Sequence, residues 1–191
     1  IELTVAMTIT LVILGITMGL FSGALGMRAR ESSKTDALTA ARAAINVISR
    51  EIANSGYGLS NNGIVIADSN GKRIRVRSNL VNTNSSTNSV SEDVTYFHDS
   101  INKSIVRFDP NASPQTSVVV NRISDIDFVY FDYTGSNSTP TQSATPTNDT
   151  GRVRITVTVE LEDVQGQPTA QTVRFTSDVT IRNSDYMLNQ Y

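Results

Sequence analysis

The chain has 191 residues, enough for one globular domain with an appendage but few for two independent cores. Its 16 basic and 18 acidic side chains leave a formal charge of -2, so no overall field favours nucleic acid or an anionic membrane as the primary partner. No cysteine is present, which excludes disulfides, thiolate metal sites and cysteine nucleophiles.

The N-terminal segment, residues 1–27, reads IELTVAMTITLVILGITMGLFSGALGM and carries one charged side chain, that of Glu2. In a helix, the uncharged stretch 3–27 is longer than the roughly 30 Å thickness of bilayer hydrocarbon. A secretory signal peptide would open with basic residues and have a shorter apolar run. The segment therefore predicts a membrane-spanning helix. By the positive-inside rule, Arg28 and Arg30 would place the part of the chain that follows in the cytoplasm.

The next segment, residues 28–55, is rich in alanine, lacks proline and ends before Gly56 and Gly58. Apolar side chains at steps of three and four predict one amphipathic face, while Arg42, Asn46 and Arg50 lie off it. This predicts one continuous helix over residues 1–55, about 80 Å long, with an apolar half and an amphipathic half. The residues expected to pack on a sheet are Leu38, Ala41, Ile45, Ile48 and Ile52.

From residue 56 to residue 191 the apolar period changes from helical to alternating, which predicts a β-rich globular head. The clearest strands cover residues 152–161 and 172–183, joined as a hairpin through VQGQPTA. ISDIDFVYFDY, residues 123–133, carries aromatic side chains on both faces and predicts a strand covered on both sides. Shorter strands are expected at 64–67, 73–77, 94–98, 105–108 and 117–120, and loops at 82–91 and 134–151.

A sheet with one dry face needs a cover, and the amphipathic helix is the only candidate that the sequence offers. The predicted fold class is therefore α+β, with a long N-terminal α-helix packed on an antiparallel β-sheet head. Burial of the five stripe side chains would contribute on the order of several kcal/mol to this packing.

An apolar helix that opens with Ile-Glu-Leu, continues as an amphipathic helix and leads into a β-rich head resembles the type IV pilin superfamily, which includes the type II secretion pseudopilins. The resemblance implies a mature N-terminus about three residues before Ile1, with the leader peptide and a methylated first residue outside this sequence. It also implies a head that faces away from the cytoplasm, contrary to the signal from Arg28 and Arg30.

Three later segments, ISREIANSGYG, ISDIDFVYFDY and TVRFTSDVTIRN, are similar to minor pilins and minor pseudopilins. Two features depart from the family pattern. Many members close a C-terminal loop with a cysteine pair, which this chain lacks, and many major pilins carry proline where this chain has Gly19.

The resemblance implies a non-enzymatic structural subunit of a type IV pilus-like filament built from identical copies. The chain would be a single-pass inner-membrane protein before assembly and part of an extracellular filament or periplasmic pseudopilus afterwards. Filaments of this class serve motility, adhesion, DNA uptake or secretion. Separate assembly machinery with cytoplasmic ATPases would supply the energy, since the chain has no phosphate-binding loop.

Three alternatives remain at this stage. The nearest is a minor pilin or minor pseudopilin that initiates or tips the filament. A membrane-anchored binding module without a filament belongs to a different class. An enzyme is the most distant alternative, since no catalytic constellation, cofactor motif or metal motif is found in the sequence.

The sharpest site candidates lie in the apolar half. For Glu2 the resemblance implies a pairing with the N-terminal amine of an adjacent subunit during assembly; the alternative is a hydrated carboxylate stabilised by the helix dipole. Gly15, Gly19 and Gly23 stand four residues apart, a spacing that lets helices pack closely in a filament core. Local unwinding of the helix, or ordinary glycine in a membrane helix, are the other interpretations.

The head offers weaker candidates. Arg73, Arg75 and Arg77 share one face of a short strand and could bind DNA phosphates, although a solvated face is the favoured interpretation. His98 is the only histidine, which leaves a metal site at most one imidazole.

Asp125, Asp127 and Asp132 lack the spacing of a calcium-binding loop and are expected to be exposed strand and edge residues. The Ser/Thr/Pro-rich stretch 134–150 predicts either an O-glycosylated segment or a plain flexible loop.

Overall fold

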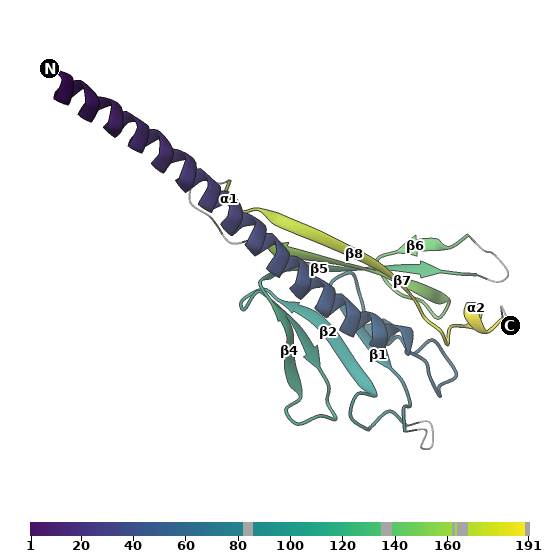
Figure 1. The fold of residues 1–191 in the computed structure, drawn as a ribbon. Coiled ribbons are helices and arrows are strands. Elements are labelled where there is room, and N and C mark those ends of the chain that lie inside the picture. Colours follow the sequence, from purple (N-terminus) through teal and green to yellow (C-terminus); the bar gives the residue numbers. More distant parts are fainter. Residues whose placement is uncertain (82–85, 135–138, 162, 164–167, 190–191) are drawn as a thin grey trace.

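The computed structural model describes residues 1–191 except 82–85, 135–138, 162, 164–167 and 190–191. It shows an α+β architecture in which one long N-terminal helix lies against two antiparallel four-stranded sheets (Figure 1). This confirms the predicted fold class. The long helix, α1, spans Glu2–Ala53 without interruption. The helix projects beyond the sheets at its N-terminal end (Figure 1).

The strands form two separate sheets. The first has the order β1-β2-β3-β4, with bounds Arg73–Arg77, Asp93–Asp99, Ser104–Phe108 and Thr116–Asn121. The second has the order β6-β5-β7-β8, and its strands in chain order are β5 Ile123–Asp132, β6 Thr141–Ser143, β7 Thr150–Glu160 and β8 Thr172–Thr180. The described residues also form the 3₁₀ helix η1, Ile66–Asp68, and the short helix α2, Asp185–Leu188.

The predicted pairing of residues 152–161 with 172–183 is confirmed, because Arg152–Glu160 of β7 pairs antiparallel with Thr172–Thr180 of β8. Residues 164–167 of the predicted connection VQGQPTA lie outside the described residues. The predicted strand at 64–67 is wrong. Only Ile64 forms a bridge, to Val76, and the chain then turns into η1. The reason is local: the N–H of Val65 donates to the carbonyl of Arg75 at 2.9 Å, while the N–H of Asp68 turns back to Val65 at 3.1 Å.

Helix α1 ends at Ala53, three residues before Gly56. Gly56 has φ +79°, and a Cβ there would lie 2.5 Å from the carbonyl oxygen of Asn61. Gly63, with φ +75°, would place a Cβ 2.1 Å from the nitrogen of Gly56. No other residue fits at either position, so the sequence itself forces the chain out of the helix and into a tight loop.

The amphipathic half of α1 packs against β7, β8 and β4. Of the predicted stripe, Ala41, Ile48 and Ile52 are completely buried and Ile45 is nearly so, whereas Leu38 is only half-buried. The buried face of α1 also includes three residues that the predicted stripe did not contain, Ser33, Ala37 and Ala44. Leu38 therefore lies at the border of this face.

The prediction that β5 is covered on both sides holds only at Phe131: one face of the strand is buried, whereas Asp125, Asp127 and Val129 on the other face remain partly exposed. Tyr130 is fully buried on one side, and Phe131 retains only 6% of its exposure on the other. Two charged side chains cover the Phe131 ring on this second side: the guanidinium carbons of Arg152 and Arg154 lie 4.1 and 5.1 Å from its centroid. Stacked arginines thus bury the outer aromatic side chain without a second helix.

Candidate functional site

The apolar half of α1 has no cover within the described molecule. All fifteen large apolar side chains from residue 1 to residue 27 are more than half exposed. Full burial of one such side chain is worth about 1.5–3 kcal/mol, whereas a whole domain is stable by only about 5–15 kcal/mol. Exposure of this segment to water is therefore energetically unfavourable. The helix is long and apolar enough to cross a membrane.

The polar side chains of this half are mostly threonines whose hydroxyls are satisfied inside the helix. Thr8 donates to the carbonyl of Thr4 at 2.7 Å, and Thr10 donates to the carbonyl of Ala6 at 2.9 Å. Thr17 bonds in the same way to the preceding turn. These hydroxyls can enter an apolar medium without losing a hydrogen bond, so the segment can be surrounded by lipid or by other helices.

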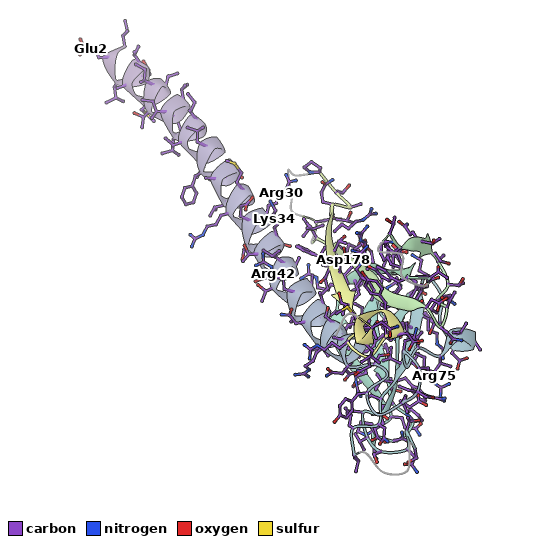
Figure 2. All side chains as sticks on the ribbon, turned by 90° about the vertical axis from the view of Figure 1, so that its right-hand side faces the viewer. Glu2, Arg30, Lys34, Arg42, Arg75 and Asp178 are labelled. Atoms are coloured by element: carbon purple, nitrogen blue, oxygen red, sulfur yellow. The ribbon has the colours of Figure 1, made fainter. Side chains whose placement is uncertain are left out.

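Glu2 lies in the first turn of α1, at the exposed tip farthest from the head (Figure 2). Its carboxylate has no hydrogen bond or ion pair with any residue that the structure describes. The position suits a negative charge, because the N-terminus of a helix carries a partial positive charge. A partner for the carboxylate in an apolar environment must come from outside the described chain.

Gly15, Gly19 and Gly23 face open space, since a Cβ at any of them would meet nothing within 4 Å. At 3.6 residues per turn, 18 residues make five turns. The glycines therefore lie on the same side of the helix as Ser33, Ala37 and Ala41, which are buried against the head. One stripe of small residues thus runs along α1, covered by the sheets in one half and open in the other.

A polar cluster fixes α1 to the first sheet. The Glu51 carboxylate accepts a hydrogen bond from the hydroxyl of Tyr96 at 2.8 Å and one from Nε of Arg107 at 3.1 Å. Arg107 also pairs with the fully buried Asp109 at 3.4 Å. Burial, together with the negative charge of Glu51, raises the pKa of the Tyr96 phenol. Because these groups are largely removed from water, the cluster favours one orientation of helix and sheet.

The C-terminal end of α1 is tied to the segment that follows β8. The N–H of Arg182 donates to the carbonyl of Ala53 at 3.1 Å, and Nδ2 of Asn183 donates to the carbonyl of Ser55 at 3.0 Å.

The buried side chain of Asn62 binds three backbone carbonyls of residues 147–150, at 2.9 to 3.1 Å. Sequence reasoning missed Glu51 and Asn62, since single polar residues leave no periodic signal.

The arginines of β1 do not form a free basic face. Arg75 binds the Asp93 carboxylate through Nε and one terminal nitrogen, both at 2.7 Å, and also pairs with Asp68. Arg77 donates to Asp93 at 2.9 Å. Burial raises the pKa of Asp93, but the two arginines outweigh it and hold this pKa below its usual range. Arg75 is therefore mostly covered, whereas the Arg77 side chain keeps 39% of its exposure, and DNA phosphates would have to displace aspartates at both.

The remaining head candidates are also engaged. Asp125 and Asp127 each accept a hydrogen bond from Nζ of Lys72 at 2.6 Å, and Asp132 accepts one from the hydroxyl of Thr150. His98 lies 2.9 Å from the carbonyl oxygen of Ile123 through Nε2. Among the described residues, no group of three potential ligands could hold a metal ion.

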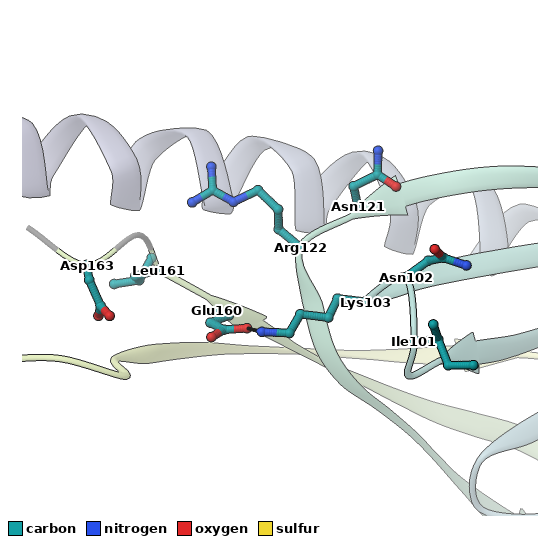
Figure 3. A pocket seen from close by; sticks show the side chains of 8 residues that line it. All are labelled: Ile101, Asn102, Lys103, Asn121, Arg122, Glu160, Leu161 and Asp163. Atoms are coloured by element: carbon teal, nitrogen blue, oxygen red, sulfur yellow. Dashed lines mark hydrogen bonds and ion pairs between the residues drawn. The ribbon is translucent and has the colours of Figure 1, made fainter.

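One open pocket of about 420 Å³ lies at the end of the head where β4 passes into β5 (Figure 3). Lys103, Arg122, Glu160 and Asp163 line it, and Lys103 is paired with Glu160. Its walls therefore carry mixed charge, and among the described lining residues there is no serine, cysteine or histidine.

Comparison of the chain with family models, curated proteins and solved structures finds no match in any of the three. The function therefore has to be inferred from the molecule itself. Its most unusual feature is a rigid helix with a packed half and an uncovered half.

Proposed function

We propose that this chain is a non-enzymatic structural subunit of a helical filament of the type IV pilus kind, assembled through residues 1–27 of α1. The observation that carries the proposal is the exposure, by more than half, of fifteen large apolar side chains on a helix whose other half is packed on the head. Such a surface needs a cover, and the same half-helix in neighbouring copies provides one.

Two environments follow for the same segment. Before assembly, residues 1–27 anchor the monomer in the inner membrane, with the head on the side away from the cytoplasm. After assembly, the segment lies in the filament core and the head forms the outer surface of an extracellular filament or periplasmic pseudopilus. The internally bonded threonine hydroxyls support both states, since neither requires a new hydrogen-bond partner for them.

Glu2 has a specific part in this proposal. An unpaired carboxylate in hydrocarbon costs several kcal/mol, and a cationic amine of a neighbouring copy removes that cost. Gly15, Gly19 and Gly23 let neighbouring helices approach closely, because no side chain stands between the backbones. Ion pairing and close packing together select one stagger between adjacent copies.

The test uses the Glu2→Ala variant, produced in cells that assemble the filament, with Glu31→Ala as the matched control. Glu31 lies in the same helix, immediately beyond the apolar half, so it has the same chemistry outside the proposed core. Sheared surface filaments are imaged by electron microscopy and their main component is identified by mass spectrometry. The proposal predicts abundant filaments with Glu31→Ala and few with Glu2→Ala, at equal amounts of membrane-bound monomer.

The alternatives give different results in the same experiment. Filaments that contain this chain only in traces would make it an initiating or tip subunit. Unchanged function with Glu2→Ala and no filaments of this chain would contradict the proposal and favour a membrane-anchored binding module.

A further inference from the structure

Strand β8 is the most open sheet edge in the part of the head that the structure describes. The outer edge of β1 is covered by bridges from Ile64 to Val76 and from Asn70 to Arg73, and β6 has only three residues. Edge strand β4 has six residues, with a register shift in its pairing to β3. Strand β8 has nine residues and pairs with β7 without a shift, and it contains no proline. Its protection is limited to the charged side chains of Arg174 and Asp178 and to the packing of α1 against the strand.

The pairing with β7 shows which backbone groups of β8 point outward. Just before β8, the N–H of Leu161 donates to the carbonyl of Gln171 at 2.8 Å; just after it, the N–H of Ile181 donates to the carbonyl of Gly151 at 2.9 Å. Hydrogen-bonded pairs alternate along antiparallel strands, so the odd-numbered residues of β8 bond to β7. The even-numbered residues therefore turn their N–H and C=O groups to the free edge. They are Thr172, Arg174, Thr176, Asp178 and Thr180.

The sequence of β8, TVRFTSDVT, is complementary to itself when read in the opposite direction. Antiparallel pairing centred on Thr176 places Arg174 opposite Asp178 of a second copy, and the reverse. The outer threonines then meet each other, as do Val173 and Val179. A shift of the pairing by two residues in either direction separates Arg174 from Asp178, so the charges specify one register.

The side chains at this edge are available for such a contact. Arg174 is exposed. Asp178 is bound by Arg154 at 2.7 and 3.0 Å and lies 3.9 Å from a terminal nitrogen of Arg152, and the hydrogen bonds from Arg154 hold its pKa below the usual range. It therefore remains a carboxylate, and Arg174 of a second copy would be the third guanidinium beside it. On the inner face, Val173 and Phe175 are only half-buried beside α1 and would gain cover from an added strand.

We propose that the free edge of β8 docks β8 of a second copy of this chain, antiparallel and centred on Thr176, so that two sheets join into one. Five facing pairs of outward residues form about ten backbone hydrogen bonds across the junction. The inference does not depend on the filament. Strand β8 runs alongside α1 (Figure 1), so the pairing directs the two α1 helices oppositely. It therefore connects copies in different membranes or in oppositely directed filaments, not neighbours within one filament.

The absence of cysteine allows a clean test with single-cysteine variants of the full-length chain in detergent micelles. Thr176→Cys lies on the proposed two-fold axis, where Cα atoms of hydrogen-bonded antiparallel pairs are about 5.5 Å apart, within reach of a disulfide. Thr156→Cys is the matched control, because Thr156 is the β7 partner of Thr176 and shares a side-chain contact with it at 3.2 Å. In the joined sheet, two copies of residue 156 lie about 14 Å apart.

The orientation is tested by mixing Thr172→Cys with Thr180→Cys and measuring disulfide-linked dimer on non-reducing gels. We expect linked dimer for Thr176→Cys and for the mixture, but little for Thr156→Cys or for either outer variant alone. Adding Arg174→Glu to Thr176→Cys should reduce the linkage at least tenfold. Equal linkage of Thr156→Cys, or self-linkage of the outer variants as strong as that of their mixture, would overturn the proposal. The Glu2→Ala variant should link normally, so failure of the filament proposal is distinguishable.

Discussion

The two halves of α1 belong to one continuous helix but differ in how far their side chains are buried. In the C-terminal half, Ala41, Ile48 and Ile52 are completely buried against the sheets. In the N-terminal half, Leu3 retains 75% of its exposure and Phe21 retains 68%. The head therefore covers the C-terminal half of the helix, whereas the N-terminal half has no cover within the described molecule.

The largest effect is expected from removing residues 1–27. A chain that starts at Arg28 should lose all membrane association yet keep the head folded, because the removed segment buries none of its large apolar side chains on the head. Fractionation of cells and circular dichroism of the purified truncated chain measure the two effects. A truncated chain that fails to fold would show that the apolar half contributes to the head.

The second prediction contrasts one isoleucine from each half. Ile48→Ala should lower the free energy of unfolding by about 2–5 kcal/mol, because it leaves a cavity at a completely buried site. Ile16→Ala, at a position 59% exposed, should change it by less than about 0.5 kcal/mol. Denaturant unfolding of both variants in the same detergent provides the measurement. Equal losses would refute the division of the helix into a packed half and an uncovered half.

The third prediction concerns Asp93 in the head, far from the apolar half. Asp93→Asn should destabilise the head by about 1–3 kcal/mol at neutral pH, since Arg75 and Arg77 lose their charged partner. The folded pKa of Asp93 is depressed, so its contribution is present above the unfolded value near 3.9 and is lost as the pH falls. Thermal unfolding below about pH 4 should therefore show less acid sensitivity in the variant than in the parent. Parallel pH profiles would contradict this.

The smallest expected effect is at the contact between α1 and the first sheet. Tyr96→Phe removes one hydrogen bond to Glu51 and should cost about 1 kcal/mol of stability at neutral pH. The folded pKa of Tyr96 is raised, so the parent should lose stability above about pH 10, where the unfolded phenol ionises. The variant should lack that part of the decline. Unfolding measured between pH 8 and pH 11 compares the two proteins.

Helix α1 and strands β7 and β8 could be predicted from the sequence, whereas contacts between distant residues could not. A period of 3.6 reveals α1, and a period of two reveals β7 and β8, because each pattern repeats over many residues. The pairs Glu51–Arg107 and Arg75–Asp93 escape prediction, since their members lie far apart in the chain and meet only in the folded head. Leu38 shows the intermediate case: the pattern finds the helix face, but only packing defines its border.

The candidate site is predictable for a related reason. Residues 1–27 bury none of their large apolar side chains against the described residues, so the apolar run, Glu2 and the three glycines can be recognised directly from the sequence. The free edge of β8 could not be found in this way. Its strand is evident from the sequence, but its place at the end of the strand order is a property of the whole sheet.

Electron cryomicroscopy of sheared surface filaments from cells that produce this chain would show directly whether residues 1–27 form a filament core. We expect filaments built from this chain, with residues 1–27 of neighbouring copies packed together in the core and Glu2 within ion-pair distance of a neighbour's amine. Filaments made of another protein, or a filament core that lacks residues 1–27, would contradict this expectation.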